Sequence, residues 1–376
     1  MNLASRLYRG ETTFNFVGRR WWGFGFSIVL LVLTVGSLAT RGLNLGLDFT
    51  GGVAWEVPSS SVTVADVEAV LGARNIDVVS AKVQELTGAG GRRLRVQVGD
   101  QPAETVAAVR ADLAGAAGVS SDSISVSSVS SSWGRSITDK AVRALAVFFV
   151  VVSLFIAWRF EWKMALAAFA SLVHDVVISV GVYSITGATV TPATVVAFLT
   201  ILGYSLYDTI VVFDKVHDNA KQLSSSRVSY GDVVNLSMNE VLMRSLNTSV
   251  AALLPVLSLL VMGSVVLGVV SLRDFSLALF VGLALGAYSS IFVAAPLLGV
   301  LKSPEPRWSA GLSTLRTGEA MSELGRQRRG SESRRVRADD GGDHLEVGAS
   351  RVMESAAAVT SALAHPPRPR KKKRRA

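Results

Sequence analysis

The chain has 376 residues, of which 49% are hydrophobic and only 18% are charged, with no cysteine and a formal net charge of +9. Its mean hydropathy of +0.41 indicates an integral membrane protein and argues against an ordinary soluble enzyme. The missing cysteines exclude disulfides and thiol redox chemistry.

The first apolar run predicts a membrane-spanning helix over residues 21–40. Residues 1–20, which precede it, carry four arginines against one glutamate. Because Lys and Arg concentrate in short cytoplasmic segments, we expect this N-terminus to be cytoplasmic. A cleavable signal peptide is the alternative, but 20 uncharged residues exceed a typical signal core, and no small-residue cleavage site follows closely.

Residues 41–140 have mixed composition and predict an external domain. We expect strands over residues 52–57, 78–86, 92–98 and 123–130, and helices over 63–74, capped by Thr63, and 103–116, opened by Pro102. The order βαββαβ is the ferredoxin-like pattern, which hosts many activities and says little about function. Because this segment has no cluster with metal-ligand spacing and no nucleophile motif, we expect a binding or contact module without a cofactor, metal or catalytic site.

Five further spans are predicted within residues 141–301. They are expected over residues 144–158, 164–186, 191–213, 245–272 and 275–301, with Arg273 and Asp274 interrupting the last two. Six spans return the C-terminus to the cytoplasm. We therefore predict an α-helical integral membrane protein with six transmembrane helices, one before and five after an external ferredoxin-like α+β domain.

Residues 302–376 predict a disordered, basic cytoplasmic tail. Seventeen Lys and Arg against nine Asp and Glu give this tail a net charge of +8, with no sustained hydrophobic period. The run RPRKKKRR at 368–375 predicts binding of anionic lipids. Ribosomal RNA is a second candidate, and a solvated run that only reinforces topology is a third interpretation. Of these we favour lipid and expect no nucleic acid.

Asp208 is the only charged residue between Thr189 and Phe213. A charge inside a spanning helix costs about 2.5 to 3.5 kcal/mol on insertion scales, so it is rarely retained without use. Tyr204 shares its helical face, which indicates an inward polar stripe. A purely structural carboxylate, held to fix helix contacts, is the alternative.

Arg244 begins the next span, with Thr248 one turn further along and Asn247 beside it. Burial favours a protonated carboxyl and a nearby cation favours a carboxylate, so a small change in the separation of Asp208 and Arg244 can switch protonation. We therefore predict a proton site formed by Asp208, Arg244 and Thr248.

His174 and Asp175 form a second titratable pair within a predicted span. Consecutive side chains point about 100° apart on a helix, so we do not expect a local dyad. Both residues, with Tyr204 and Asn247, are candidates for the proton path.

Five segments, in order and with the expected spacing, resemble the SecF family of Sec-translocon accessory subunits, which pair with SecD and belong to the resistance-nodulation-division superfamily. The segments are LGLDFTGG at 45–52, HDVVISVG at 174–181, TPATVVAFLTILGYSLYDTIVVFDKV at 191–216, RSLNTS at 244–249 and GLALGAYSSIFVAAPL at 282–297.

The resemblance implies that the protein, with SecD, uses the proton-motive force to help a preprotein pass through the SecYEG channel, with SecA as a further partner, in a bacterial cell membrane. It also assigns roles to residues. Asp208 matches the family's intramembrane proton-site aspartate, Arg244 its essential arginine and Thr248 the hydroxyl one turn on. Asp48, Gly51 and Gly52 match the motif just outside the first span.

The sequence departs from the family pattern near the predicted proton site. The family usually has Asn where this chain has Tyr207, Thr at Ser245, and a Thr-Thr pair near Val250 and Ala251. Hydrogen bonding around Asp208 is therefore expected to differ from that of the family.

Two other function classes remain open. One is a proton-coupled exporter of lipid or drug, although such pumps usually carry two six-span halves. The other is a passive scaffold of the channel complex. The GxxxG formed by Gly282 and Gly286 is interpreted as simple close helix packing.

Overall fold

The computed structural model describes residues 12–58, 62–88, 91–223, 228–267, 269–309, 315–328 and 330. The chain divides into two compact units, Met1–Gly318 and Glu319–Ala376, and the elements named below lie in the first. In the second unit, residues 319–328 are helical. The basic run at 368–375 lies outside the described residues.

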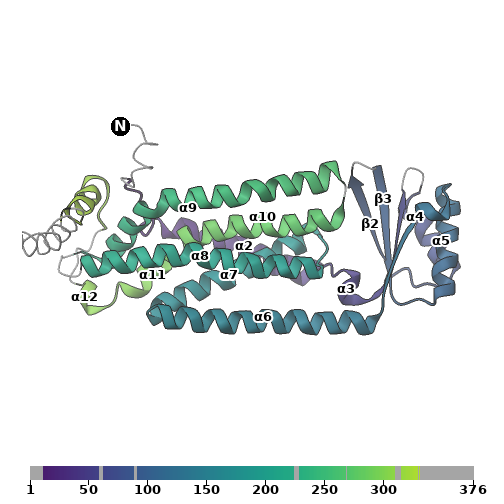
Figure 1. Cartoon of the computed structure of the whole chain (residues 1–376), viewed down its shortest axis with the longest axis horizontal. Helices are drawn as coiled ribbons and strands as arrows, with labels where there is room; N and C mark the ends of the chain where they lie inside the picture. Colours follow the sequence, from purple (N-terminus) through teal and green to yellow (C-terminus); the bar gives the residue numbers. More distant parts are fainter. Residues whose placement is uncertain are drawn as a thin grey trace, which may run out of the picture. The chain divides into compact units, whose positions relative to one another are not determined.

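Within the described residues, six helical stretches are long and apolar enough to cross a membrane (Figure 1). They are α2 (Arg20–Arg41), α6 (Ser131–Arg159), α7 (Trp162–Thr186), α8 (Pro192–Gln222), α9 (Tyr230–Val261) with the π-helical η2 (Met262–Val266), and α10 (Val270–Ser289) with the π-helical η3 (Ser290–Ala294) and α11 (Ala295–Lys302). A four-residue helix, α12 (Pro306–Ser309), follows. The predicted fold, with one span before and five after a small sheet, is confirmed.

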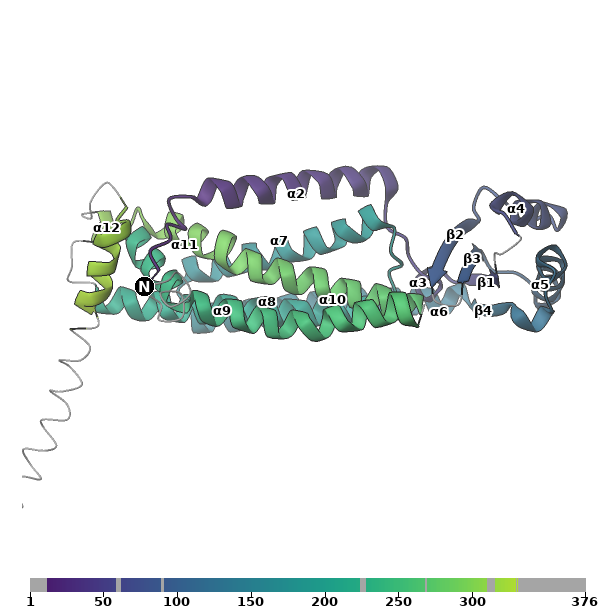
Figure 2. The ribbon, with the colours of Figure 1, turned by 90° about the horizontal axis from the view of Figure 1, so that it is seen from above.

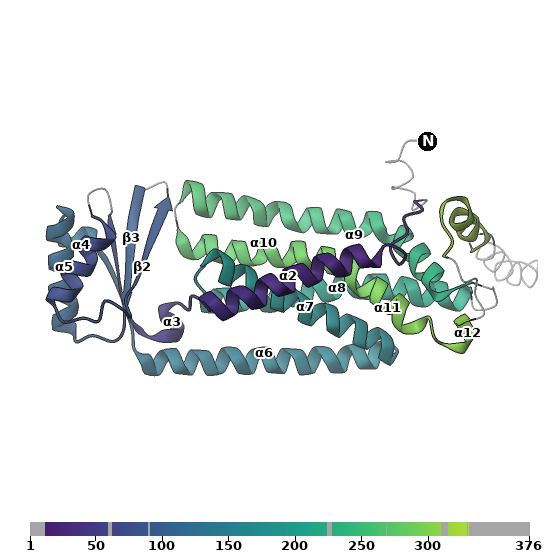
Figure 3. The same cartoon turned by 180° about the vertical axis from the view of Figure 1, so that it is seen from behind.

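Helix α10 contacts three other spans, α7, α8 and α9, whereas α2 packs along α7 and η3. Figure 2 shows α7 between α2 and the group of α8, α9 and α10, and Figure 3 shows α2 crossing α7. The spanning parts of α2, α6 and α9 bury less than a fifth of their residues. Because the exposed side chains there are mostly Leu, Val, Ile, Phe and Trp, these faces suit contact with lipid.

The fifth span ends with η2 at Val266 and the sixth begins with α10 at Val270, so the predicted break at Arg273 and Asp274 is wrong. Both charged residues lie inside α10, where Arg273 Nη2 is 3.0 Å from Asp274 Oδ1. The described residues between the two spans, Leu267 and Val269, are apolar, so the hydropathy of the sequence does not fall there. It falls instead at Arg273 and Asp274, which form an ion pair inside the helix.

The small domain between α2 and α6 has the predicted ferredoxin-like topology. Its elements are β1 (Gly52–Pro58), α4 (Val64–Ala73), β2 (Lys82–Gly88), β3 (Gly91–Val98), α5 (Ala103–Ala117), η1 (Ser121–Ser123) and β4 (Ser125–Val129). The strand order is β2-β3-β1-β4 and every pairing is antiparallel. Both helices lie on one face of the sheet, and Trp55, Leu94 and Leu113 are fully or almost fully buried between the two layers (Figure 1).

The predicted start of α4 is also confirmed, and it depends on a reciprocal cap. Thr63 accepts a hydrogen bond from the backbone N–H of Asp66, and the Asp66 carboxylate accepts from the backbone N–H of Thr63. Backbone N–H groups at a helix start have no acceptor within the helix, and this cap supplies acceptors for two of them.

Two glycines lie between the first span and the sheet domain, where the chain passes close to the backbones of Ser131 and Val98. The short helix α3 (Leu47–Thr50) packs on α6. Gly51 follows with φ 73°, and a Cβ there would lie 2.5 Å from Ser131 Cα. Gly52 has φ 115°, and its Cβ would lie 2.1 Å from Val98 O. Both positions therefore exclude a side chain by contact as well as by dihedral angle.

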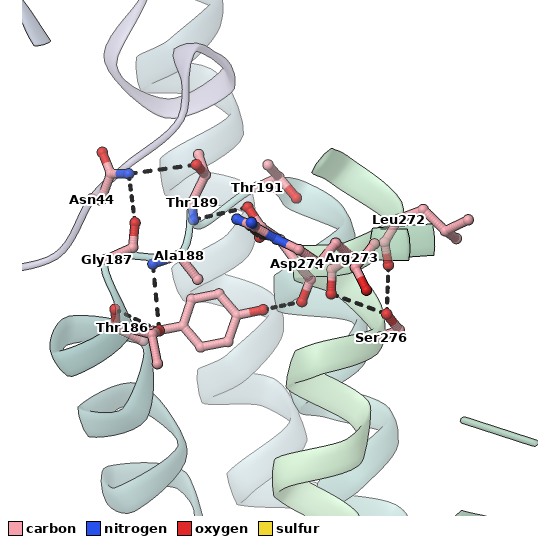
Figure 4. A network of polar contacts seen from close by, with 12 residues as sticks. Asn44, Thr186, Gly187, Ala188, Thr189, Thr191, Leu272, Arg273, Asp274 and Ser276 are labelled. Carbon is pink, nitrogen blue, oxygen red and sulfur yellow. Dashed lines mark hydrogen bonds and ion pairs between the residues drawn. The ribbon is translucent and has the colours of Figure 1, made fainter. Parts of the chain in front are cut away.

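The segment before α3 is hydrogen-bonded to the connection between α7 and α8. Gly46 N donates to Val190 O at 2.8 Å, and Val190 N donates to Asn44 O at 2.8 Å. Asn44 Nδ2 donates to Gly187 O at 3.0 Å (Figure 4). These bonds join the chain that carries the sheet domain to the start of α8.

The buried Asp274 extends this connection to the sixth span. Its Oδ2 accepts from Thr189 N at 3.0 Å, while its Oδ1 accepts from Arg273 Nε and Nη2 (Figure 4). The Tyr183 hydroxyl donates to the backbone carbonyl of Asp274. This carboxylate is thus fully partnered, which indicates a structural role that fixes α10 to the α7–α8 connection.

At the opposite end of the spans, a buried lysine meets a carboxylate between α6 and α7. The Lys302 side chain is 2% exposed, and its Nζ lies 2.5 Å from Glu161 Oε2. Burial alone raises the pKa of Glu161, but Lys302, with Arg307 and His217 nearby, lowers that pKa below its ordinary value. The pair therefore stabilises the fold above the ordinary carboxyl pKa, and this contribution is lost as pH falls through the lowered pKa.

We expect Gly52→Ala to destabilise the sheet domain, by about 1–3 kcal/mol for a strained backbone with a steric contact. Gly91→Ala is the matched control, because Gly91 also has positive φ, 94°, but has open space around it. Thermal unfolding of the full chain in detergent measures both variants. Equal losses would show that the dihedral angle alone, and not contact with Val98, requires glycine at position 52.

We expect Glu161→Gln to cost about 3 kcal/mol, the lower end of the range for a broken buried pair, because Lys302 is left without its carboxylate and Glu161 is itself 43% exposed. The double variant Glu161→Gln/Lys302→Met removes the unpaired charge and should recover part of this loss. Glu85→Gln, whose pair with Arg92 is exposed, is the control and should cost under about 1 kcal/mol. A double variant no more stable than the single one would contradict the burial argument.

Candidate functional site

The predicted proton-site aspartate lies inside α8, almost completely buried. Asp208 is 5% exposed, and its Oδ2 accepts a hydrogen bond from Ser290 Oγ. Ser290 is the first residue of η3, and its Oγ also lies 3.2 Å from Ala287 O. One hydroxyl therefore connects the carboxyl group to the last span.

Asp175 in α7 is fully buried and has a complete set of partners. Its Oδ2 accepts from Ser205 Oγ at 2.6 Å and from Ser289 Oγ at 2.7 Å. Its Oδ1 lies 2.9 Å from His174 Nδ1. Groups from α7, α8 and α10 thus meet at this carboxyl group.

The expectation that His174 and Asp175 form no local dyad is wrong. Their Cα–Cβ bonds diverge on the helix, but the imidazole is long enough to turn back, so that Nδ1 reaches the neighbouring carboxyl group. Periodicity fixes where a side chain starts and leaves open where its polar end goes.

A chain of hydroxyl groups leads from His174 toward the start of α2, and it fixes the histidine tautomer. Tyr288 Oη is 2.7 Å from Gly23 O, which can only accept, so the tyrosine proton goes there. The 3.0 Å contact of Tyr288 Oη with Ser27 Oγ then uses the serine proton. Ser27 can therefore only accept from His174 Nε2, at 3.0 Å, which places a proton on Nε2.

The 2.9 Å contact between His174 Nδ1 and Asp175 Oδ1 completes a continuous series of hydrogen bonds. This series runs from Asp175 through His174, Ser27 and Tyr288 to the backbone carbonyl of Gly23.

Two tyrosines on α8 contact the other predicted residues, which lie on α9. Tyr204 Oη donates to the backbone carbonyl of Thr248 at 2.8 Å. Arg244 Nη2 donates to Tyr207 Oη at 3.4 Å. Tyr207, the departure from the family's Asn, thus occupies the place next to the arginine.

The structure does not join Asp208 and Arg244 directly. Within the described part of the chain, Arg244 has no ion pair, and Asp208 is bonded to Ser290 instead. Thr248 Oγ1 donates to carbonyls of its own helix, and Asn247 is exposed. Arg244 is instead bonded to Tyr207, whose exposed side chain precedes the buried Asp208 in the sequence.

The remaining predicted residues lie elsewhere. Asp48 is in the first turn of α3, and Gly51 and Gly52 follow it, at the sheet-domain end of α2. They lie where the chain enters the sheet domain and do not join the buried carboxyl groups. In the described residues, no group of three or more His, Asp or Glu side chains is placed to hold a metal ion.

Sequence reasoning did not predict the serines that partner the two aspartates, which are Ser205, Ser289 and Ser290. It also missed Ser27 and Tyr288, which continue the hydrogen bonds from His174. The available signal was the run AYSSIF at 287–292, which places three consecutive hydroxyl residues inside an apolar span. At the junction of α10 and η3, consecutive serines reach carboxyl groups on two different helices. Such π-helical turns are frequent at functional sites.

Close packing of α10 on α8 brings these serines into reach. A Cβ at Gly282 would lie 2.3 Å from Ile201 Cδ1, and one at Gly286 would lie 2.9 Å from Ser205 Cβ. The interpretation of this GxxxG as a packing motif is confirmed.

Known proteins are similar to this chain over most of its length. The family described as "Protein export membrane protein SecD/SecF, C-terminal" matches residues 109–303, and the "SecD/SecF GG Motif" matches residues 36–53. The chain is 44% identical over 310 residues to the protein translocase subunit SecF of Streptomyces coelicolor, covering 82% of each. It is 41% identical over 314 residues to that of Mycobacterium tuberculosis, covering 80% of this chain and 70% of the relative.

A solved structure has the same fold. It is the crystal structure of SecDF, a translocon-associated membrane protein from Thermus thermophilus, with a TM-score of 0.70 and 31% identity. The alignment covers 80% of this chain and 40% of that one, so this chain spans about two fifths of the solved protein.

We expect Ser289→Ala to destabilise the bundle by about 1–3 kcal/mol, because it removes one hydrogen bond from the fully buried Asp175. Ser258→Ala is the matched control, since that exposed serine on α9 only bonds the carbonyl of Leu254 in its own helix. Thermal unfolding of the full chain in detergent compares the two. If both variants unfold together with the unmodified protein, the carboxyl group does not depend on this hydroxyl.

Proposed function

The chain belongs to the SecD/SecF family of protein export membrane proteins, and we propose that, together with SecD, it uses the proton-motive force to promote preprotein translocation through the SecYEG channel. The six apolar helices make it a multi-pass membrane protein. SecD as the partner is supported by the SecDF relative, in which the matched part is only two fifths of one chain. SecYEG, SecA and the preprotein are further proposed contacts. The protein then acts as a translocase accessory subunit and not as an enzyme.

We place both termini in the cytoplasm of a bacterial cell and the sheet domain on the outer side of its membrane. The arginines before α2 and the basic residues after α11 support this orientation through the excess of positive charge on the cytoplasmic side. We propose the same domain division as the sequence predicts, with residues 41–140 outside and the basic tail inside, where residues 368–375 bind anionic lipids.

The observation that carries the proton-coupling proposal is the burial of Asp208 against a neutral hydroxyl, while Arg244 is bonded to Tyr207, the residue that precedes Asp208 in the sequence. A serine can donate to a carboxylate and can also accept from a carboxylic acid, so Ser290 serves either protonation state. Arg244 favours only the ionised state. The arrangement around Asp208 fits its protonated state, with Arg244 held at Tyr207.

Proton release from Asp208 then changes which partner is favoured. A carboxylate left in the apolar interior attracts Arg244, whose present contact is a single 3.4 Å hydrogen bond. In this proposal, moving the guanidinium from Tyr207 to Asp208 draws the α9 backbone toward α8, and the bond from Tyr204 to the Thr248 carbonyl one turn away has to adjust to that movement. Each proton that crosses 100 mV supplies about 2.3 kcal/mol for this motion.

His174 and Asp175 are proposed as the next proton-holding pair. Ser205 and Ser289 bond Asp175. Ser205 lies on α8, as Asp208 does, and Ser289 is next to Ser290, which bonds Asp208. The chain through Ser27 and Tyr288 leads on to the N-terminal end of α2. Tyr204 and Asn247 complete the proposed path on the α8–α9 side.

We expect Asp208→Asn to assemble normally and to lose the gradient-dependent part of secretion, because an amide cannot release a proton. Asp214→Asn is the matched control, since Asp214 lies on the same helix but forms an exposed pair with Arg159. Arg244→Lys should be poor and Arg244→Met worse, since lysine lacks the planar fork and methionine leaves the carboxyl protonated.

The measurement is secretion of a reporter with and without an uncoupler, at matched membrane levels. The unmodified protein should lose its advantage over each variant once the gradient is collapsed. Gradient-dependent secretion by Arg244→Met at the normal level would refute the coupling role. Unchanged secretion by Asp208→Asn would favour a passive scaffold, and purification as a stable homotrimer without SecD would favour an exporter.

A further inference from the structure

An apolar cavity of about 620 Å³ lies beside the N-terminal end of α2, on the side of the spans away from the sheet domain. It is lined by the segment before α2, by α2, by α9 and by η3. The lining residues are Phe14, Asn15, Phe16, Arg19, Trp22, Leu242 and Phe292. Four of the seven are aromatic, and Arg19 is the only charged one.

A second hollow, of about 400 Å³, continues from this cavity along α2. The two share Trp22, and the second is lined further by Trp21, Gly25, Phe26 and Val29. Val29 is nine residues from Arg20, which is about 14 Å along a helix. That length is about half of the roughly 30 Å hydrocarbon core, or the depth of one leaflet.

The cavity and the hollow together form a groove along α2, and the cavity is its wider end. This end carries two polar side chains with groups that have no partner among the described residues. In the described residues, the Arg19 guanidinium has no hydrogen bond or ion pair. Asn15 Oδ1 accepts from Asn235 Nδ2 and from Gly18 N, which fixes the amide, while Asn15 Nδ2 has no acceptor among the described residues. A cation and an amide donor are therefore available at one end of an apolar channel.

The neighbouring residues place this end at the level of lipid headgroups. Trp21 and Trp22 are 70% and 83% exposed, and tryptophan concentrates at the membrane interface. Arg20 is already engaged, with Nη1 on Val17 O at 3.2 Å and its guanidinium over the ring of Trp21. Only Arg19 of the two arginines is free to meet a ligand at the cavity.

From this geometry we propose that the groove along α2 binds one anionic phospholipid. Arg19 and Asn15 hold the phosphate, and an acyl chain lies along Trp22 and Phe26 toward Val29. This site is separate from the basic run at 368–375 and does not depend on proton coupling. The lipid would contact Phe292, whose ring stacks on Tyr288 at 5.6 Å, so the site adjoins the hydroxyl chain that ends at His174.

The test is native mass spectrometry of the full chain released from nanodiscs that contain equal amounts of phosphatidylglycerol and phosphatidylcholine with the same acyl chains. The unmodified protein should retain one phosphatidylglycerol in preference to phosphatidylcholine. Arg19→Gln should lower that preference about fivefold, since one basic residue near the surface contributes about 1 kcal/mol. Arg20→Gln is the matched control and should change it less.

A second pair of variants tests the channel itself. Leu242→Trp should fill the cavity and lower retention of the bound lipid, whereas Leu254→Trp, on the exposed face of α9, should not. Inorganic phosphate should not displace the lipid, because the acyl chain contributes to binding; displacement would indicate a simple anion site and refute the proposal.

Three further outcomes would also overturn it. Equal retention in Leu242→Trp and Leu254→Trp would mean ordinary boundary lipid. Equal effects of Arg19→Gln and Arg20→Gln would remove the assigned headgroup contact. Lipid retention that is absent throughout, with co-purification of SecD lost only in Leu242→Trp, would identify a partner helix as the occupant.

Discussion

Two carboxyl groups inside an apolar bundle need hydrogen-bond partners, and much of the interior arrangement of this protein serves that need. An unpartnered polar group at membrane depth costs several kcal/mol, because no water is present to replace a lost hydrogen bond. Here the partners of Asp175 and Asp208 include the adjacent serines 289 and 290 at the junction of α10 and η3. The glycines at 282 and 286 permit the close approach of α10 to α8 that lets Ser289 and Ser290 reach them.

The chemical type of these partners matters as much as their position. A hydroxyl group donates to a carboxylate or accepts from a carboxylic acid, so it stabilises either state without choosing between them. A guanidinium stabilises only the ionised state. Because Asp208 is bonded to Ser290 while Arg244 contacts Tyr207, the carboxyl group has a partner that suits either protonation state, and the cation that would select the ionised state is not bonded to it.

Much of the fold could be predicted from the sequence, because the signals are local. Uncharged runs identify spans, alternation identifies the strands, and the Thr63 cap identifies the start of α4. The boundary between the fifth and sixth spans could not be predicted, since its described residues are as apolar as the helices it joins. The prediction of a break at Arg273 and Asp274 was wrong because the two side chains form an ion pair, which allows both charged residues to lie inside a helix.

The candidate site was predictable only in its charged members. A lone Asp in a span is conspicuous, whereas serine is common in membrane helices and gains its meaning from what lies opposite. The three serines that hold Asp175 and Asp208 come from positions 205, 289 and 290, and only tertiary packing joins them. The same limit applies to Arg244, whose present contact depends on how α9 lies against Tyr207.

The attachments of α8 near its start differ from the contacts between α8 and α9 at the candidate site. The start of α8 follows a connection bonded to Asn44, Gly46 and Asp274, so its displacement would break several short hydrogen bonds or carry the sheet domain's support with it. At the level of the site, α9 meets α8 through one bond from Tyr204 to Thr248 and one 3.4 Å bond from Arg244 to Tyr207. Bringing Arg244 to an ionised Asp208 exchanges the weaker of these for a charge-assisted bond in an apolar interior, where such a bond is strongest. A change in protonation at Asp208 would therefore act first on this weak contact of Arg244. Further along the two helices, Asn219 of α8 is bonded to Ser237 and Glu240 of α9, and Lys215 pairs with Glu240, so these contacts hold the helices together away from the site.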